Sequence, residues 1–320
     1  VDVNVPTAGT SAATVDDDGL SGGNAASTVD DLDADATDEE RTHSDDESIF
    51  DGTLDFDFGG DGAGTVDFAG MDNTTAQVGL ETVRFDWTGG VLTATVEGGD
   101  RNGTDLFTVS LNATSGEYTV TLLDNVLHAD GPNDEATDAT VALTYTVTDA
   151  DNSTANPEGT LNITLDDDAP TATDLGTSNV NEGATVTGSL SFAEGADGAS
   201  VTHINEVALV FDAQDENYSQ AVDIGGGSIK VKADGSYSFT ADDPTFSPVD
   251  PTQATFTVTD GDGDTAVADI NFQVVDVNVP TAGTSAATVD DDGLSGGNAA
   301  STVDDLDADA TDEERTHSDD

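Results

Sequence analysis

The stretch GTLNITLDDDAPTA, at positions 159–172, joins a β-strand pattern to an acidic turn. Its first eight residues alternate apolar and polar side chains, which is the period-two pattern of a half-buried strand. Asp166, Asp167 and Asp168 end this pattern. Pro170 then fixes its own φ angle and holds the residue before it in an extended conformation. The stretch therefore predicts the last strand of a β-domain, followed by a stiff and negatively charged joint.

The same order of strand pattern, acidic residues and proline occurs a second time in the chain. The stretch AVADINFQVVDVNVPTA, at 266–282, again has a strand pattern, then acidic residues, then a proline. Upstream of the two joints, GTLDFDFGGDGAG (52–64) aligns without gaps to GSLSFAEGADGAS (188–200). These similarities predict two homologous β-domains. We place domain A at residues 6–168, with an acidic insertion near 7–46, and domain B at 169–278.

Period-two alternation also covers most of the chain outside these stretches. Val, Thr, Ile, Phe and Tyr dominate the alternating segments, and Gly, Asp and Asn separate them, which is typical of strands and turns. No segment has a convincing amphipathic pattern of helical length, and 36–48 would make a helical turn or two at most. The predicted fold class is therefore all-β. Further predicted strands lie at 106–111, 117–123, 141–149, 228–241 and 254–260.

One segment of the chain is present in two identical copies. Residues 1–46 and 275–320 match letter for letter, at an offset of 274. We therefore interpret the chain as one repeating unit plus the beginning of the next. In this interpretation residues 1–5 end a preceding linker, and 279–320 are an incomplete start of a second domain A. We expect this incomplete part to be poorly ordered, or paired with a neighbouring molecule.

The charge balance excludes some classes of partner. The chain has 67 Asp and Glu residues against 6 Lys and Arg residues, a formal net charge of −61. Such a surface repels nucleic acids and anionic membranes and attracts cations. There is no cysteine, no apolar run approaches the ~20 residues of a membrane helix, and the first residues do not form a signal peptide. We expect an internal fragment whose targeting signal lies elsewhere.

Acidic turns that follow predicted strands are the candidate metal sites. In each turn Asp or Asn alternates with small residues, so several carboxylates can converge on one cation. Calcium takes six to eight oxygen ligands, whereas magnesium keeps water and needs strict octahedral geometry. The turns are therefore predicted to bind Ca²⁺, although solvated acidic turns on a salt-adapted surface are the alternative. The candidate ligands are Asp149, Asp151, Asp166, Asp167, Asp168, Asp260, Asp262 and Asp264.

Two further places extend this set. The stretch DDDGLSGGN (16–24) begins like an EF-hand loop, with Asp16 and Asp18 as candidate ligands, but its Gly falls at the fourth position and no helix flanks it. Glu182 either reaches back to the 166–168 linker as a bridging ligand or is an exposed glutamate.

The stretches GTLNITLDDDAPTA (159–172) and TFTVTDGDGDTAVADINFQVVDVNVPTA (255–282) resemble the tandem immunoglobulin-like repeats of giant bacterial surface adhesins exported by type I secretion, which often end in repeats-in-toxin modules. VDDDGLSGGN and GGDGAG are also similar to type I secretion repeat domains. The acidic linkers resemble the calcium-binding hinges of cadherins, although DVNVP lacks part of the cadherin pattern.

This resemblance implies tandem immunoglobulin-like β-sandwiches joined by short acidic calcium-binding linkers, on the outside of a bacterial cell. It implies a structural extender that calcium stiffens and that projects an adhesive region from the surface. The linker ligands would be Asp166, Asp167 and Asp168, and in the other linker copies Asp276, Asn278, Asp2 and Asn4. Adjacent repeats of the same chain would be the partners.

Two other functions stay open. Trp87, the single tryptophan, either stacks on a sugar or lies in a core, so the chain is alternatively a recognition module for a glycan, ice or a cell surface. A self-assembling fibre subunit, joined through residues 275–320, is the other alternative. Any host, glycan or surface ligand of the parent protein is otherwise expected outside this chain. Neither nucleic-acid binding nor direct membrane insertion is expected.

Catalysis is not expected. The histidines His43, His128, His203 and His317 do not lie in a zinc-binding or catalytic-triad motif. Paired carboxylates are abundant, but they fall in turns that resemble hinges.

Overall fold

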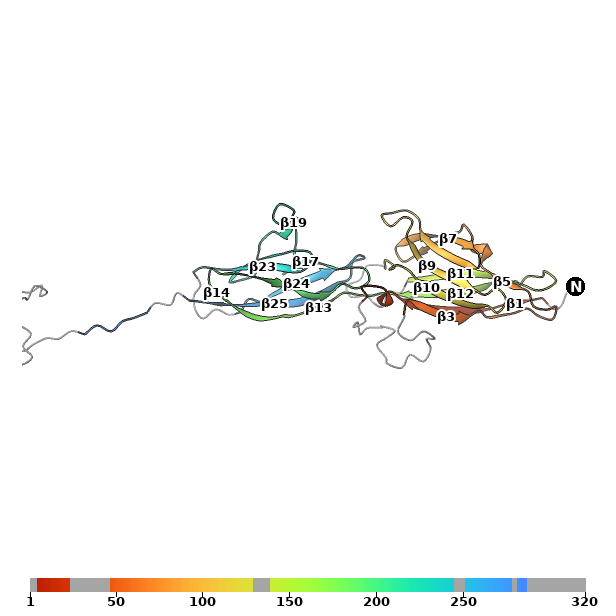
Figure 1. Ribbon diagram of the computed structural model, residues 1–320, viewed down its shortest axis with the longest axis horizontal. Coiled ribbons are helices and arrows are strands. Elements are labelled where there is room, and N and C mark those ends of the chain that lie inside the picture. The colour runs from red at the N-terminus through yellow and green to blue at the C-terminus, as the bar shows by residue number, and fades with distance from the viewer. Residues whose placement is uncertain (1–4, 24–46, 129–138, 245–250, 278–280, 287–320) are drawn as a thin grey trace, which may run out of the picture. The chain divides into compact units, whose positions relative to one another are not determined.

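Strands form almost all of the regular structure (Figure 1). This computed structural model describes residues 5–23, 47–128, 139–244, 251–277 and 281–286. Within these ranges the only helices are two three-residue 3₁₀ turns, η1 (Asp17–Gly19) and η2 (Ala69–Met71). None of the described helical segments is long and apolar enough to cross a membrane. The prediction of an all-β fold is confirmed.

The first sandwich has a six-stranded antiparallel sheet in the order β3-β10-β9-β8-β7-β6 and a four-stranded sheet in the order β2-β12-β11-β5. A short pair, β1 with β4, completes it. The strands are β1 (Thr7–Ala8), β2 (Thr10–Asp16), β3 (Ile49–Thr53), β4 (Phe56–Asp57), β5 (Thr65–Asp67), β6 (Thr75–Val78), β7 (Glu81–Thr88), β8 (Val91–Val96), β9 (Asp105–Leu111), β10 (Glu117–Leu122), β11 (Ala139–Thr148) and β12 (Gly159–Asp166).

The second sandwich has a five-stranded sheet in the order β14-β25-β24-β17-β18 and a four-stranded sheet in the order β15-β23-β22-β21. Two short pairs accompany them, β13 with β16 and β19 with β20. The strands are β13 (Thr171–Thr173), β14 (Leu175–Asn181), β15 (Thr185–Ser189), β16 (Ser191–Ala193), β17 (Ser200–Ile204), β18 (Val207–Ala208), β19 (Phe211–Asp212), β20 (Tyr218–Ser219), β21 (Val222–Asp223), β22 (Gly227–Val231), β23 (Ser236–Ala241), β24 (Ala254–Thr259) and β25 (Thr265–Val275).

Each sandwich has its own apolar core, and the alternation seen in the sequence builds it. In β11 every second residue is buried, including Leu143, Tyr145 and Val147. In the second sandwich, Phe239 of one sheet stacks on Phe272 of the other, with ring centroids 4.1 Å apart and nearly parallel planes. Burial of these faces is the main favourable contribution to folding.

The two sandwiches share one topological feature that positions the acidic turns. In each, an early strand pairs in parallel with the last strand: β2 with β12, and β14 with β25. Parallel pairing brings the carboxyl ends of both strands to the same end of the sandwich. Asp16 therefore lies opposite Asp166, and Asn181 lies opposite Val275.

Residues 278–320 form a separate unit of the chain. Within it the structure describes 281–286, which are exposed and have no regular secondary structure. The predicted incomplete start of a second domain A, and its pairing with a neighbouring molecule, fall largely outside the described residues.

Tyrosine rings cover glycines on neighbouring strands at several places. Tyr145 lies opposite Gly159, and Tyr118 lies opposite Gly52. The Tyr145 hydroxyl also donates to the carbonyl of Asp55 at 2.6 Å, which holds the ring in place. A Cβ atom built on Gly159 would lie 2.1 Å from this ring. The ring therefore occupies the space that a side chain at Gly159 would need.

Replacing Gly159 by alanine is expected to lower the free energy of unfolding of the first sandwich by about 1–3 kcal/mol, because Tyr145 must move out of a packed position. Trp87 packs against this core, so its fluorescence during urea unfolding reports this sandwich. Gly70→Ala is the matched control, since a Cβ there would meet nothing within 4 Å. Equal midpoints for Gly159→Ala and the unchanged protein would contradict this account.

Candidate metal centre

Four groups of acidic or imidazole side chains in the described residues bring their ligand atoms within 4.8 Å of one another. Three of them share members and lie together where the first sandwich meets the second. The fourth lies in a turn of the first sandwich. The groups are Asp17–His128–Asp167, Asp167–Asp197–Asp262, Asp260–Asp262–Asp264 and Asp61–Asp149–Asp151.

Strand register explains how the junction forms on the side of the first sandwich. The pairing of β2 with β12 ends at Asp16 opposite Asp166, so Asp17 and Asp167 leave the sheet side by side. His128 belongs to the segment that follows β10. These three side chains are almost fully buried, with Asp17 and His128 each 1% exposed.

The second sandwich contributes two turns to the junction. Asp197 lies between β16 and β17, and Asp262 lies between β24 and β25. Hydrogen bonds connect these turns to the first sandwich: the His128 amide donates to Asp262 Oδ2 at 2.7 Å, and the Asn125 amide donates to Asp197 Oδ1. Within this framework the linker residue Asp168 accepts from the Ala196 amide at 2.7 Å.

Burial first, and then the crowding of negative charge, raises the pKa values of three of these carboxyl groups. Burial and the neighbouring Asp262 carboxylate raise the pKa of Asp197 to about 8. Burial also raises the pKa of Asp260 to about 7, against the lowering effect of the Gly263 amide. Burial and then the Asp197 and Asp167 carboxylates raise the pKa of Asp17 well above its ordinary value. Without a cation, the cluster must therefore hold protons near neutral pH.

The turns at 260–264 and 149–153 have a simpler local geometry. Asp260 Oδ1 accepts from the amides of Gly263 and Asp264, at 3.0 and 2.7 Å. Asp149 Oδ1 accepts from the amides of Asp151 and Ser153, at 3.2 and 2.8 Å. The second oxygens of Asp260 and Asp149 are buried and have no hydrogen-bond partner among the described residues. These oxygens are available to a cation.

The structure brings together some of the predicted ligands. Asp167 and Asp262 meet at the junction, Asp260 and Asp264 share a turn with Asp262, and Asp149 with Asp151 approaches Asp61. Asp16, Asp166 and Asp168 are buried beside the junction but belong to none of the four groups. Asp276, at the end of β25, is likewise outside them. Asp2, Asn4, Asn278 and the side chain of Asp18 lie outside the described part of the chain.

Neither alternative for Glu182 is correct: it does not reach back to the 166–168 linker, and at 8% exposure it is buried. Glu182 follows β14, which runs away from this linker, and its Oε1 accepts from the Val277 amide at 3.3 Å. Asp17 takes the corresponding place at the 166–168 linker. Both residues come directly after the strand that pairs in parallel with the last strand of their sandwich. Glu182 therefore belongs to the following linker.

Asp17, His128, Asp61 and Asp197 were not among the predicted ligands. Asp61 and Asp197 occupy the same position in the aligned stretches 52–64 and 188–200. Asp61 approaches the acidic turn that follows β11, and Asp197 approaches the acidic turn that follows β24. The alignment of these two stretches could have identified Asp61 and Asp197 as equivalent candidate ligands. His128 has no such signal, because it lies far in sequence from every residue that it contacts at the junction.

Comparison with known proteins agrees with this architecture. Residues 167–273 match a family described as "Bacterial Ig domain", and residues 26–164 match a family described as "Domain of unknown function (DUF5801)". A search of curated proteins gave no match. Both sandwiches are thus all-β, and the second resembles an immunoglobulin domain.

Solved structures similar to the chain include Drosophila N-cadherin EC1-3, at 15% identity over 53% of this chain and a TM-score of 0.25. Human CDH23 EC21-23 matches at 17% identity over 59% of this chain and a TM-score of 0.26. The chain spans 51% and 57% of the lengths of these two structures.

The raised pKa values predict an unusual pH dependence of the metal-free protein. A carboxyl group whose pKa is higher in the folded state stabilises the fold below its unfolded pKa, and this stability is lost as pH rises through the folded pKa. In EDTA, the melting temperature should therefore fall between pH 5 and pH 8. Each extra proton held by the folded state contributes a slope of about 1.4 kcal/mol per pH unit.

Calorimetry across this pH range measures the effect. Asp197→Asn should flatten the slope, whereas the exposed Asp100→Asn should leave it unchanged. A melting temperature that rises steadily with pH in EDTA would contradict the crowded-carboxylate account.

Proposed function

We propose that the chain is a spacer segment of a bacterial surface adhesin, in which calcium stiffens the joint between successive sandwiches. The meeting of Asp167, Asp197 and Asp262 carries this proposal. Asp167 comes from the linker, and the other two come from separate turns of the second sandwich. A cation held by all three would fix the linker to the sandwich that follows it.

The donor set fits calcium. All three ligands are carboxylates, the kind of oxygen donor that calcium prefers. Asp262 also belongs to the neighbouring Asp260–Asp262–Asp264 group, so it can bridge two ions. Asp197 Oδ2 and Asp260 Oδ2 are buried and lack hydrogen-bond partners among the described residues. Several oxygens are therefore oriented by the fold and left for a cation.

The role as a spacer on a bacterial surface has separate support. The match of 167–273 to a bacterial immunoglobulin-like family supports an extracellular location. The identity of 1–46 and 275–320 supports a repeated array. Export by type I secretion and repeats-in-toxin modules elsewhere in the parent protein follow from the resemblance of the linker and strand sequences to those adhesins.

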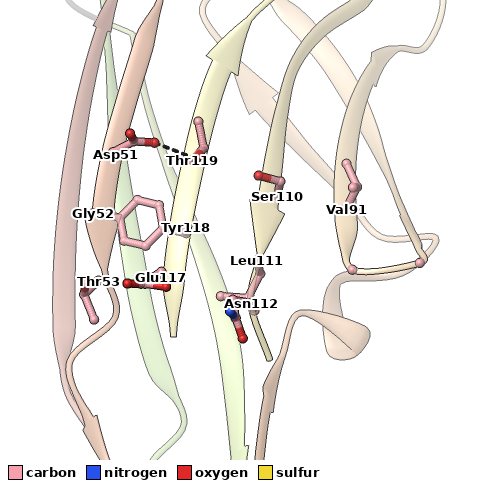
Figure 2. Close-up of a pocket in the computed structure, with 12 residues that line it drawn as sticks. Asp51, Gly52, Thr53, Val91, Ser110, Leu111, Asn112, Glu117, Tyr118 and Thr119 are labelled. Atoms are coloured by element: carbon pink, nitrogen blue, oxygen red, sulfur yellow. Dashed lines mark hydrogen bonds between the residues drawn. The ribbon is translucent and has the colours of Figure 1, made fainter. Parts of the chain in front are cut away.

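Recognition of a ligand is a second candidate, favoured by a hollow in the first sandwich (Figure 2). The hollow measures about 750 Å³ and lies along β3, β10, β9 and β8. Asp51, Asn112, Glu117 and Thr119 are among its polar residues, and the Thr119 hydroxyl donates to Asp51 at 2.5 Å. Trp87 lies elsewhere, with its ring edge-on to Phe68 at 5.8 Å. A glycan array that binds the unchanged protein but not Glu117→Gln would support recognition.

Calcium is expected to raise the stability of the second sandwich. With dissociation constants of about 10⁻⁴–10⁻³ M, each site contributes about 1.4–2.7 kcal/mol at 10 mM calcium. Differential scanning calorimetry in EDTA and in calcium measures this difference. Asp262→Asn should remove most of it, because Asp262 belongs to two groups. Asp269→Asn, on the exposed face of β25, should retain it. Calcium-independent melting of the unchanged protein would contradict the proposal.

Stiffening of the joint has its own test. The chain has no cysteine, so Asp100→Cys in the first sandwich and Val210→Cys in the second allow specific spin labelling at exposed sites. Pulsed electron paramagnetic resonance should show a narrow distance distribution in calcium and a broad one in EDTA. Distance distributions of equal width in calcium and in EDTA would contradict stiffening of the joint by calcium.

A further inference from the structure

His128 is the one imidazole that the described acidic groups contain. It is 1% exposed, and its Nε2 lies 3.2 Å from the Leu165 carbonyl oxygen. A carbonyl oxygen only accepts hydrogen bonds, so Nε2 carries a proton. Nδ1 is then either a lone pair or the second N–H of an imidazolium.

Nδ1 faces carboxylates. It lies 2.9 Å from Asp167 Oδ1 and 3.8 Å from Asp262 Oδ2, and an oxygen of Asp17 is within 4.8 Å. Neither Nδ1 nor Asp17 Oδ1 has a hydrogen-bond partner of good geometry among the described residues. A lone pair in this position would face only negative oxygens, so either a proton or a metal ion must lie between Nδ1 and the carboxylates.

The surroundings orient each of these groups. The Val126 amide donates to Asp17 Oδ2 at 3.3 Å, which leaves Oδ1 directed away from this bond. The Leu165 carbonyl fixes the tautomer and orientation of the His128 ring. A backbone carbonyl on the distant ring nitrogen is one of the usual partners of a metal-bound histidine, beside a carboxylate or water.

We propose that Asp17, His128 and Asp167 bind one divalent transition-metal ion of the zinc type, distinct from calcium. Calcium and magnesium select oxygen ligands, whereas imidazole nitrogen with carboxylates suits zinc and its neighbours. Two carboxylates and one imidazole supply three ligands, and water or Asp262 supplies the fourth. The proposed site does not depend on calcium binding to the neighbouring Asp167–Asp197–Asp262 group.

The two kinds of ion would bind on opposite sides of the linker residue Asp167. Asp17 and His128 belong to the first sandwich, so the zinc-type ion ties the linker residue Asp167 to that sandwich. The Asp197 and Asp262 carboxylates, on the other side of Asp167, belong to the second sandwich. Asp167 is the residue that both groups share.

The test uses the full chain, stripped of metal and then supplied with millimolar calcium. Addition of Co²⁺ should give the strong visible absorption of a tetrahedral site at one equivalent, and Zn²⁺ should abolish it. Long-range ¹H–¹⁵N spectra of the unchanged protein should show Zn²⁺ shifting His128 Nδ1 while Nε2 stays protonated. This measurement does not depend on any variant folding.

Variants then assign the site. His128→Gln and Asp17→Asn should each weaken Co²⁺ binding at least tenfold, and His203→Gln should not change it, since His203 contacts Thr202 and belongs to none of the acidic groups. The proposal is overturned if excess Zn²⁺ leaves the His128 nitrogen signals unchanged, if Nδ1 stays protonated throughout, or if folded His128→Gln binds Co²⁺ as tightly as the unchanged protein.

Discussion

Repulsion between buried carboxylates is the constraint on which the junction depends. The parallel register of β2 and β12 forces Asp17 and Asp167 out of the sheet side by side, and the second sandwich adds Asp197 and Asp262. The pKa values of Asp17, Asp167 and Asp197 rise, first because burial disfavours the ionised form and then because neighbouring carboxylates repel it. Protons or metal ions must supply the missing positive charge, and ions allow the carboxylates to stay ionised at neutral pH.

The same construction is present twice, which makes the joint a property of the repeat. One end of each sandwich presents an aspartate from a glycine-rich turn beside the acidic turn after a long strand: Asp61 in the first, Asp197 in the second. The other end presents Asp17 or Glu182 beside the last strand. The joint between the two sandwiches therefore combines one end of each type.

Alternation of apolar residues was sufficient to predict the all-β class and much of the strand set, because burial on one sheet face imposes period two. Acidic spacing identified Asp260, Asp262 and Asp264, which lie in one turn. It did not identify Asp17 and His128, because strands and loops distant in sequence bring them to Asp167. Glu182 was assigned to the wrong linker because alternation does not reveal the direction in which a strand crosses its sandwich.

Anomalous diffraction from crystals grown in calcium tests the central claim most directly. The account predicts a calcium peak within about 2.3–2.6 Å of oxygens from Asp167, Asp197 and Asp262. Direct hydrogen bonds between these carboxyl groups, with no anomalous peak among them, would show that protons alone hold the two sandwiches together.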